Sequence, residues 1–362
     1  MEDLSINAVL KDLRRENNLT QEELAKKMGV TRDMVARMDA ELQNVKFEYL
    51  VEFAKAIQMS VSAIMQRFEN GPEFVYLLRA AHGSYFSDNL RMRYEKWYRS
   101  MEQVTISIPL PQIREIPKRE SRFADIADDV ERGECVACWL RQKWNLGTNP
   151  IDDPVNLIES LGYFIIGADL GDIELFAITG KKKGTDIPGI VINTNRNITI
   201  ERQRYSVIHE LGHIVEHDSQ FDAVPDTHGR GRSKDLRDKF ADAFAGEFLV
   251  PAEELKRLYK QFYIRNFDNK VIYLKNHFRV SYECILNRLF RCGLLNMDKK
   301  AFGAFLGKKR AFFNKKEPFP MKTPLSFNQE NQLKDMIQRE KKYSEPEQNP
   351  PVSSMRISYA NP

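Results

Sequence analysis

The chain has 362 residues, of which 42% are hydrophobic and 29% charged, and this ordinary globular composition leaves room for two or three domains. The net charge of +4 permits nucleic-acid binding without requiring it. The sequence has no apolar run near the ~18 residues of a membrane span and no signal-peptide core at its charged N-terminus, so we expect a cytoplasmic protein without a membrane partner.

Residues 1–68 are predicted to form a compact helical domain. Thr20 and Glu23 make a capping-box pattern at the start of one helix, and Gly29 separates that helix from a second one that begins at Thr31. Helix, short glycine turn and helix is the helix-turn-helix pattern. Apolar residues recur at helical spacing throughout: Leu10, Leu13, Leu24, Met28, Val35, Met38, Leu50, Phe53, Ile57 and Ile64.

The stretch LTQEELAKKMGVTRDMVARMD, residues 19–39, closely resembles the Cro/C1-type (XRE) DNA-binding domains. The resemblance covers about 60 residues. It departs at Asp39 and Ala40, where such domains more often carry a glutamate and a short polar turn. A helical protein-interaction domain of the same shape is the alternative.

In such a domain the second helix of the motif enters the major groove of DNA. Its first-turn residues Thr31, Arg32 and Asp33 would then face base edges, with Arg37 one turn further along. Gln21, at the start of the preceding helix, would meet a phosphate. Arg32 is the best candidate for reading a base, because arginine bidentate to guanine is the commonest specific contact. A phosphate contact is the alternative for Arg32.

Residues 69–118 are interpreted as a connector. The apolar residues 74–78 and the segment 91–104 suggest two amphipathic helices. The following stretch 106–120 contains three prolines and is expected to run extended.

A second domain is expected from about residue 119. Helices are predicted at 126–144 and 154–161, and short strands at 163–166, 175–178 and 187–193. A further helix carries residues 207–215, a polar loop follows over 217–234, and another helix runs from about 235 to 249 before Pro251. Four cysteines are present, of which Cys135 and Cys138 form a lone CxxC; we interpret them as incidental reduced thiols.

The C-terminal third has weaker signals. Residues 271–295 again have a helix-turn-helix pattern, which more often packs on a catalytic domain than reads DNA. Residues 299–324 hold eight Lys/Arg against one Glu, and we expect a solvated basic edge there, with a nucleic-acid contact as the alternative. The last 20 residues have the composition of disordered segments.

The most informative motif is His-Glu-Leu-Gly-His at residues 209–213. On a helix, His209 and His213 leave the same face and can bind one zinc ion. Glu210 lies about 100° around the helix, where it can act as a general base on the attacking water rather than as a ligand. The alternative is a helix with two structurally satisfied histidines.

A catalytic zinc site needs a third protein ligand. The metzincin pattern does not supply it, because Glu216 and Ser219 stand where that pattern requires a glycine and a histidine. His217 continues the same helical face but lies about 6 Å further along the axis, so we consider it a substrate contact or a residue behind the ligands.

The stretches ERQRYSVIHELGHIVEHD and ADAFAGEFLVP, residues 201–218 and 241–251, together with the N-terminal domain, resemble the ImmA/IrrE metallopeptidase family. The resemblance implies that His209 and His213 are metal ligands and that Glu210 is the catalytic acid/base. It further implies Asp238 as the third ligand and Asp242 as a carboxylate that orients an imidazole. The family usually has glutamate at the place of Asp238, so the helices must approach more closely here. Asp235 and Glu247 are rival ligands, and Tyr205, His217 and His228 are candidate oxyanion donors.

The expected fold is therefore multidomain. An all-α helix-turn-helix domain (1–68) and the connector (69–118) precede an α+β zincin-like metallopeptidase domain with a helical C-terminal subdomain (119–300). A basic segment and a flexible tail follow (301–362).

A DNA reader joined to a peptidase predicts regulation. The resemblance implies that a zinc-dependent endopeptidase cleaves a repressor, an antitoxin-like partner or the chain itself. Expected partners are DNA, through residues 1–68, and a protein substrate, while a homodimer stays open. The alternative is a non-catalytic transcriptional regulator whose zinc domain is structural or ligand-sensing. Glu210 argues against it, because a structural zinc site has no use for a general base.

Overall fold

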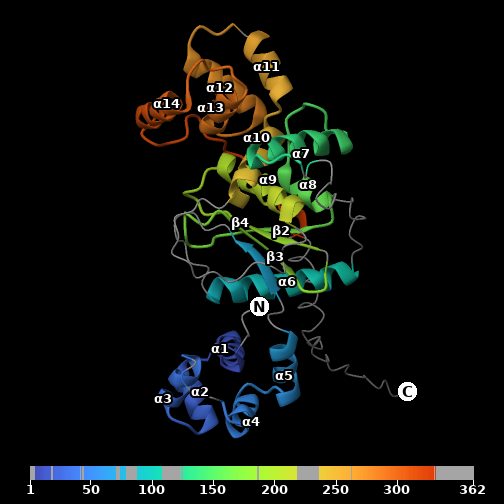
Figure 1. Ribbon diagram of the computed structural model, residues 1–362, viewed down its shortest axis with the longest axis vertical. Helices are drawn as coiled ribbons and strands as arrows, with labels where there is room; N and C mark the ends of the chain where they lie inside the picture. The colour runs from blue at the N-terminus through green and yellow to red at the C-terminus, as the bar shows by residue number, and fades with distance from the viewer. Residues whose placement is uncertain are drawn as a thin grey trace, which may run out of the picture.

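The computed structural model describes residues 5–17, 19–40, 42, 45–70, 74–78, 88–107, 123, 125–185, 187–217, 236–261, 263–329 and 331. The elements follow one long axis, with the N-terminal helices at one end, a sheet covered by helices in the middle and the C-terminal helices at the other end (Figure 1). None of the helices among these residues has the length and apolar character needed to cross a membrane.

Five helices make up the described part of the N-terminal domain: α1 (Ile6–Glu16), α2 (Gln21–Met28), α3 (Arg32–Asp39), α4 (Phe47–Ala56) and α5 (Val61–Asn70). The Thr20 hydroxyl accepts from the Glu23 N–H, and the Glu23 carboxylate accepts from the Thr20 N–H, so the predicted capping box begins α2. Gly29 ends α2 with a φ of 68°, a conformation that suits glycine. All the apolar residues that the helical spacing singled out in this domain are buried.

Asp39, one of the departures from the XRE pattern, joins the first three helices. Its carboxylate lies 2.7 Å from the Arg14 guanidinium of α1 and accepts a 2.8 Å hydrogen bond from the Gln21 amide of α2. Arg14 and Asp39 are both buried. A buried pair of this kind is costly to break on one side only, because the remaining charge is left without its partner.

The second domain is built on a four-stranded sheet of order β1-β3-β4-β2, made by β1 (Phe74–Leu78), β2 (Phe164–Ala168), β3 (Ala177–Lys182) and β4 (Gly189–Asn193). β1 and β4 are both antiparallel to β3, whereas β2 is parallel to β4. The three predicted strands are present with shifted ends.

Part of the predicted connector, residues 74–78, belongs to this sheet as β1. The prediction of a helix over residues 74–78 is wrong, because this apolar run pairs with β3 from Phe74↔Lys182 to Leu78↔Ile178. The predicted second helix is α6 (Asp88–Ser107), which lies against the sheet on the side away from the helices of the second domain (Figure 1). A Cβ at Gly189 would lie 2.8 Å from the Tyr98 ring, so α6 and β4 are in close contact.

The opposite face of the sheet is covered by α7 (Asp129–Lys143), α8 (Pro154–Ser160), α9 (Ile200–His217) and α10 (Leu236–Leu249). Gly133 of α7 lets this helix lie close to α10, since a Cβ there would be only 2.5 Å from the Phe240 carbonyl oxygen. The prolines of the expected extended stretch, Pro109, Pro111 and Pro117, lie outside the described residues.

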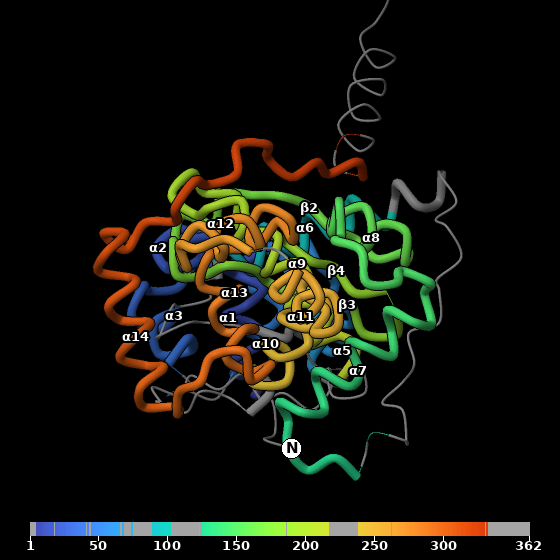
Figure 2. The backbone as a smooth tube through the Cα atoms, turned by 90° about the horizontal axis from the view of Figure 1, so that it is seen from above, coloured from blue at the N-terminus to red at the C-terminus, as the bar shows by residue number. Residues whose placement is uncertain are grey.

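Four more helices complete the chain: α11 (Ala252–Gln261), α12 (Phe267–Phe278), α13 (Tyr282–Arg291) and α14 (Lys299–Phe312). The helix-turn-helix pattern of 271–295 corresponds to α12 and α13, which pack into the same core as α9 and α10. Seen along the long axis, α11 to α13 lie over α9 and α10, and α14 lies at the rim (Figure 2).

The segment after α14 returns to the sheet. The Gln329 amide accepts from the Ile165 N–H and donates to the Tyr163 carbonyl, at 3.1 and 2.9 Å. These bonds satisfy the outer edge of β2 as a neighbouring strand would. Residues 299–329 therefore form α14 and a segment that contacts the sheet, and the expected flexible tail lies outside the described residues.

Candidate metal centre

Helix α9 forms because its apolar residues share one face and meet the sheet. Val207, Ile208, Leu211, Ile214 and Val215 are all at most 4% exposed. The polar residues of the motif are nearly as deeply placed. His209 is 0% exposed, Glu210 1% and His213 7%. Three polar side chains buried so close together need hydrogen-bonding or metal partners. Their burial therefore indicates a functional site rather than a solvated helix face.

Three side chains converge between α9 and α10. The Nε2 atoms of His209 and His213 are 3.0 Å apart, and Oδ1 of Asp238 lies 3.7 Å from the first and 3.5 Å from the second. A tetrahedral zinc ion with bonds of ~2.0–2.1 Å holds its ligand atoms about 3.3 Å apart. The three measured separations bracket that value, so the residues fit a small tetrahedral cation such as zinc.

The short aspartate side chain reaches the histidines because α9 and α10 are in close contact. A Cβ at Gly212 would lie 3.1 Å from the Ala241 Cα and 3.0 Å from the Phe244 ring. Any side chain at residue 212 would therefore push α10 away. The glycine inside the motif and the small alanine opposite it supply the close approach that an aspartate in place of glutamate requires.

Asp242 lies one turn after Asp238 and faces the other side of the His209 ring. Its Oδ1 is 3.0 Å from His209 Nδ1, the nitrogen that points away from the three converging atoms. Tyr205 donates a 2.8 Å hydrogen bond to the Asp242 backbone oxygen. A carboxylate at that nitrogen favours the tautomer whose Nε2 lone pair is free for a metal.

Glu210 is held by the sheet. Its carboxylate accepts a 2.6 Å hydrogen bond from the Thr179 hydroxyl of β3, and Thr179 is 0% exposed. The sequence does not single out Thr179, because a lone threonine in an apolar strand forms the same pattern whichever residue it contacts. A strand register fixed across the whole sheet brings it to Glu210.

The remaining predicted residues fall into two groups. Glu247, a rival metal ligand, is 3% exposed and forms an ion pair with Arg288 of α13, so its carboxylate has a partner other than the metal site. Tyr205, a candidate oxyanion donor, is engaged with the Asp242 carbonyl. His228 and Asp235 lie outside the described residues. His217 belongs to α9, but its side chain is not described.

Glu216, the residue that excluded the metzincin pattern, has a structural partner. Its carboxylate accepts a 2.9 Å hydrogen bond from the Arg132 guanidinium of α7. Both residues are at most 9% exposed. This ion pair fixes the end of α9 that follows His213.

The CxxC thiols are ordinary. Cys135 and Cys138 are free, both on α7. Cys138 is an exposed residue, but partial desolvation of its thiol and the neighbouring Glu247 carboxylate raise the pKa of Cys138 to about 12, so it is a neutral thiol at physiological pH. A zinc ligand would need the thiolate.

The predicted DNA-contacting residues lie on α2 and α3. Thr31, Arg32 and Asp33 are exposed at the start of α3, where the Thr31 hydroxyl accepts from the Met34 N–H. Arg37 pairs with Asp33 at 3.1 Å, which offsets its charge. Gln21, as described above, donates to Asp39, which leaves its backbone N–H as the group available for a phosphate.

Two family models match the chain. The helix-turn-helix model matches residues 10–64, and the model of the IrrE N-terminal-like domain, a peptidase family, matches residues 167–290. These matches confirm both resemblances and the multidomain fold. No curated protein matches the sequence. Among solved structures, the crystal structure of ComR from Streptococcus suis aligns at 13% identity over 95% of this chain and 91% of that chain, with a TM-score of 0.17.

Proposed function

We propose that this chain, which joins a helix-turn-helix domain to an IrrE N-terminal-like peptidase domain, is a DNA-binding regulator with zinc-dependent endopeptidase activity. One observation carries the proposal: His209, His213 and Asp238 bring three ligand atoms within 4.8 Å of one another, while Glu210 is held beside them by a different partner. A structural zinc site would show the ligands without the separate carboxylate.

When bound, zinc would polarise a peptide carbonyl and make a nearby water acidic enough to be deprotonated near neutral pH. His209, His213 and Asp238 would hold the ion. Glu210 would accept the proton of the attacking water and later deliver a proton to the leaving nitrogen. Thr179 would keep the Glu210 carboxylate in one orientation during both transfers.

The depth of the site favours a selective peptidase. His209 and Glu210 are essentially unexposed, whereas the Asp238 side chain is 23% exposed, so a substrate would enter from the Asp238 side. A folded protein surface cannot reach such a site, but an extended segment can. We therefore propose that the substrate is one regulatory protein, such as a repressor or an antitoxin-like partner, or an accessible segment of this chain.

The experiment incubates the full chain, loaded with zinc, first alone and then with each protein encoded by a neighbouring gene that has the size and pattern of a helix-turn-helix repressor or an antitoxin. Glu210→Gln is the matched control, because it preserves size and polarity but cannot accept the proton. We expect one dominant cut, in the partner or in the chain itself, that is lost by ~10²–10⁴-fold in Glu210→Gln.

Two results would contradict this function. If Glu210→Gln cleaved its target at the rate of the unmodified chain, the proposed mechanism would be wrong. If the chain rapidly digested unrelated denatured proteins, the proposed regulatory role would be wrong. Zinc binding and operator binding without any cleavage would instead favour a regulator whose zinc domain is structural or ligand-sensing. The proposal also includes DNA as a partner, bound through residues 1–68, and a homodimer. A DNA-binding assay would test the first, and the molecular mass in solution would test the second.

A further inference from the structure

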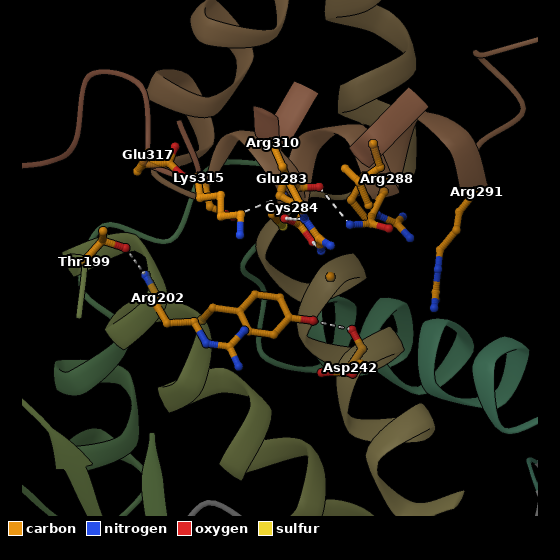
Figure 3. A pocket seen from close by; sticks show the side chains of 15 residues that line it. Thr199, Arg202, Asp242, Glu283, Cys284, Arg288, Arg291, Arg310, Lys315 and Glu317 are labelled. Carbon is orange, nitrogen blue, oxygen red and sulfur yellow. Dashed lines mark hydrogen bonds and ion pairs between the residues drawn. The ribbon is translucent and has the colours of Figure 1, made fainter. Parts of the chain in front are cut away.

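A pocket of about 590 Å³ lies between the metal-centre helices and the C-terminal helices. Its lining comes from α9 and α10 on one side, and from α13, α14 and the segment after α14 on the other. Arg291 and Lys315 extend from opposite sides into the space above Asp242 (Figure 3). Small-molecule sites in proteins have volumes of roughly 300–1,000 Å³, so the size suits a metabolite.

The pocket is separate from the metal centre. None of His209, Glu210, His213 and Asp238 lines it. Asp242 lines it instead, and this carboxylate contacts the nitrogen of His209 that points away from the other two metal ligands. A molecule in the pocket would therefore lie behind a metal ligand and not in the place of a scissile peptide.

Positive charge predominates in the lining. Five basic side chains line the pocket, against three carboxylates: Arg202, Arg288, Arg291, Arg310 and Lys315 against Asp242, Glu283 and Glu317. Two of these carboxylates already have cationic partners, and the third lies against an imidazole. Glu283 pairs with Arg310, Glu317 lies 3.0 Å from the buried Lys275, and Asp242 faces His209.

The basic groups are matched less completely. Arg288 is committed to Glu247 and Glu134, and Arg291 shares Glu134 at 3.3 Å. Lys315 makes no ion pair with the residues that the structure describes. The Arg202 guanidinium carbon lies 3.9 Å from the centre of the Phe176 ring and makes a cation–π contact with it. The pocket thus offers Lys315 and the open side of Arg291 to an anion.

We propose that this pocket binds a small phosphorylated molecule. Arginine and lysine donors converging from two sides match the several acceptor oxygens of a phosphate better than a single carboxylate. Tyr205 and Leu306 provide apolar lining for an organic part. Binding is coupled to the metal centre, because the ligand would contact Asp242 and change how that carboxylate holds the His209 ring. Only this coupling rests on the zinc site proposed above.

Binding is tested on the metal-free full chain by calorimetric titration with inorganic phosphate and with adenosine monophosphate. The variant Arg291→Gln/Lys315→Gln removes two exposed charges from the pocket. Lys308→Gln/Lys316→Gln removes two exposed charges that do not line it, and is the matched control. We expect affinity to fall about tenfold or more in the first variant and to stay unchanged in the control.

The comparison of probes identifies the ligand source. Equal affinity for both probes indicates free phosphate, and tighter binding of the nucleotide indicates an organic phosphate. Absence of binding by either probe at millimolar concentration would overturn the proposal, and so would equal weakening in both charge variants. Binding that requires duplex DNA would also overturn it, because α13 would then contact nucleic acid.

Coupling is measured as the zinc dissociation constant, by chelator competition, with and without the phosphate ligand. We expect a change of about fivefold or more in the unmodified chain. In Asp242→Asn we expect the ligand to bind while the change in zinc affinity disappears. Phosphate also binds free zinc, but this effect is common to both proteins and cancels. A chain that binds no zinc would refute the proposed peptidase and leave the test of the pocket intact.

Discussion

The hydroxyl of Thr179 donates a 2.6 Å hydrogen bond to the carboxylate of Glu210, and this bond ties the sheet to the helix that carries the metal-binding motif. Both residues are at most 1% exposed. A buried carboxylate without such a donor would be strongly destabilised. The same bond fixes the orientation of the carboxylate that is the proposed general base.

Replacement of Thr179 by valine should slow peptide cleavage about tenfold with little change in KM, because the base loses its orientation and not its substrate. Zinc content should stay at the unmodified level, since Thr179 is not among the converging ligand atoms. Thr179→Ser keeps the hydroxyl and should restore most of the rate. Loss of zinc in Thr179→Val would show that the bond supports the fold of the site instead.

The ligand set is tested by metal analysis of three alanine variants. Asp238→Ala should lose zinc nearly as completely as His213→Ala, because each removes one of three ligand atoms. His217→Ala should retain zinc, since one further turn of helix places residue 217 about 6 Å beyond residue 213. The reverse outcome, an empty site in His217→Ala and a full one in Asp238→Ala, would contradict the assignment.

Gly212→Ala should weaken zinc binding about tenfold or more without touching a ligand, because the new methyl group must displace Ala241 and Phe244. Gly303→Ala in α14 is the control. A Cβ there meets nothing within 4 Å, so this variant should keep its zinc affinity and gain up to about 1 kcal/mol in helix stability. Equal zinc affinity in both variants would mean that α10 tolerates the shift.

Cys138 should react slowly with iodoacetamide at pH 8. Partial desolvation and the Glu247 carboxylate disfavour the thiolate and raise the pKa of Cys138 to about 12, so the reactive fraction grows as the pH rises towards that value. The rate should increase about tenfold per pH unit between pH 8 and 10. Cys135→Ser/Cys138→Ser should hold as much zinc as the unmodified chain. A plateau in rate below pH 9 would contradict the raised pKa.

Arg32→Ala should weaken binding to a selected DNA site. The loss should be ~1–3 kcal/mol of discrimination at a single base pair. The motif is obtained by selection with the full chain, and the discrimination is measured by gel shift at fixed salt. Lys46→Ala, an exposed change outside α3, is the control. Affinity lost equally for all sequences would make Arg32 a phosphate anchor, and no DNA affinity at low salt would favour protein interaction.

Several features of this protein could be predicted because they depend on neighbours in the sequence. The 3.6-residue period of a helix places His209 and His213 on one face whatever surrounds them. The capping box at Thr20 and the left-handed Gly29 are equally local. Asp238 was identified through family resemblance, because its distance of 25 residues from His213 contains no periodic signal.

Other features were decided only by tertiary structure. The apolar run 74–78 is compatible with a helix or a strand, and its pairing with β3, about a hundred residues away, makes it a strand. Thr179 meets Glu210 only because the sheet register and the packing of α9 coincide. The pocket of about 590 Å³ joins α9 and α10 to helices from the last third of the chain. Contacts between residues so far apart in the sequence depend on how the faces of helices and sheets pack together. A sequence pattern indicates which residues are buried, but not which of them are in contact.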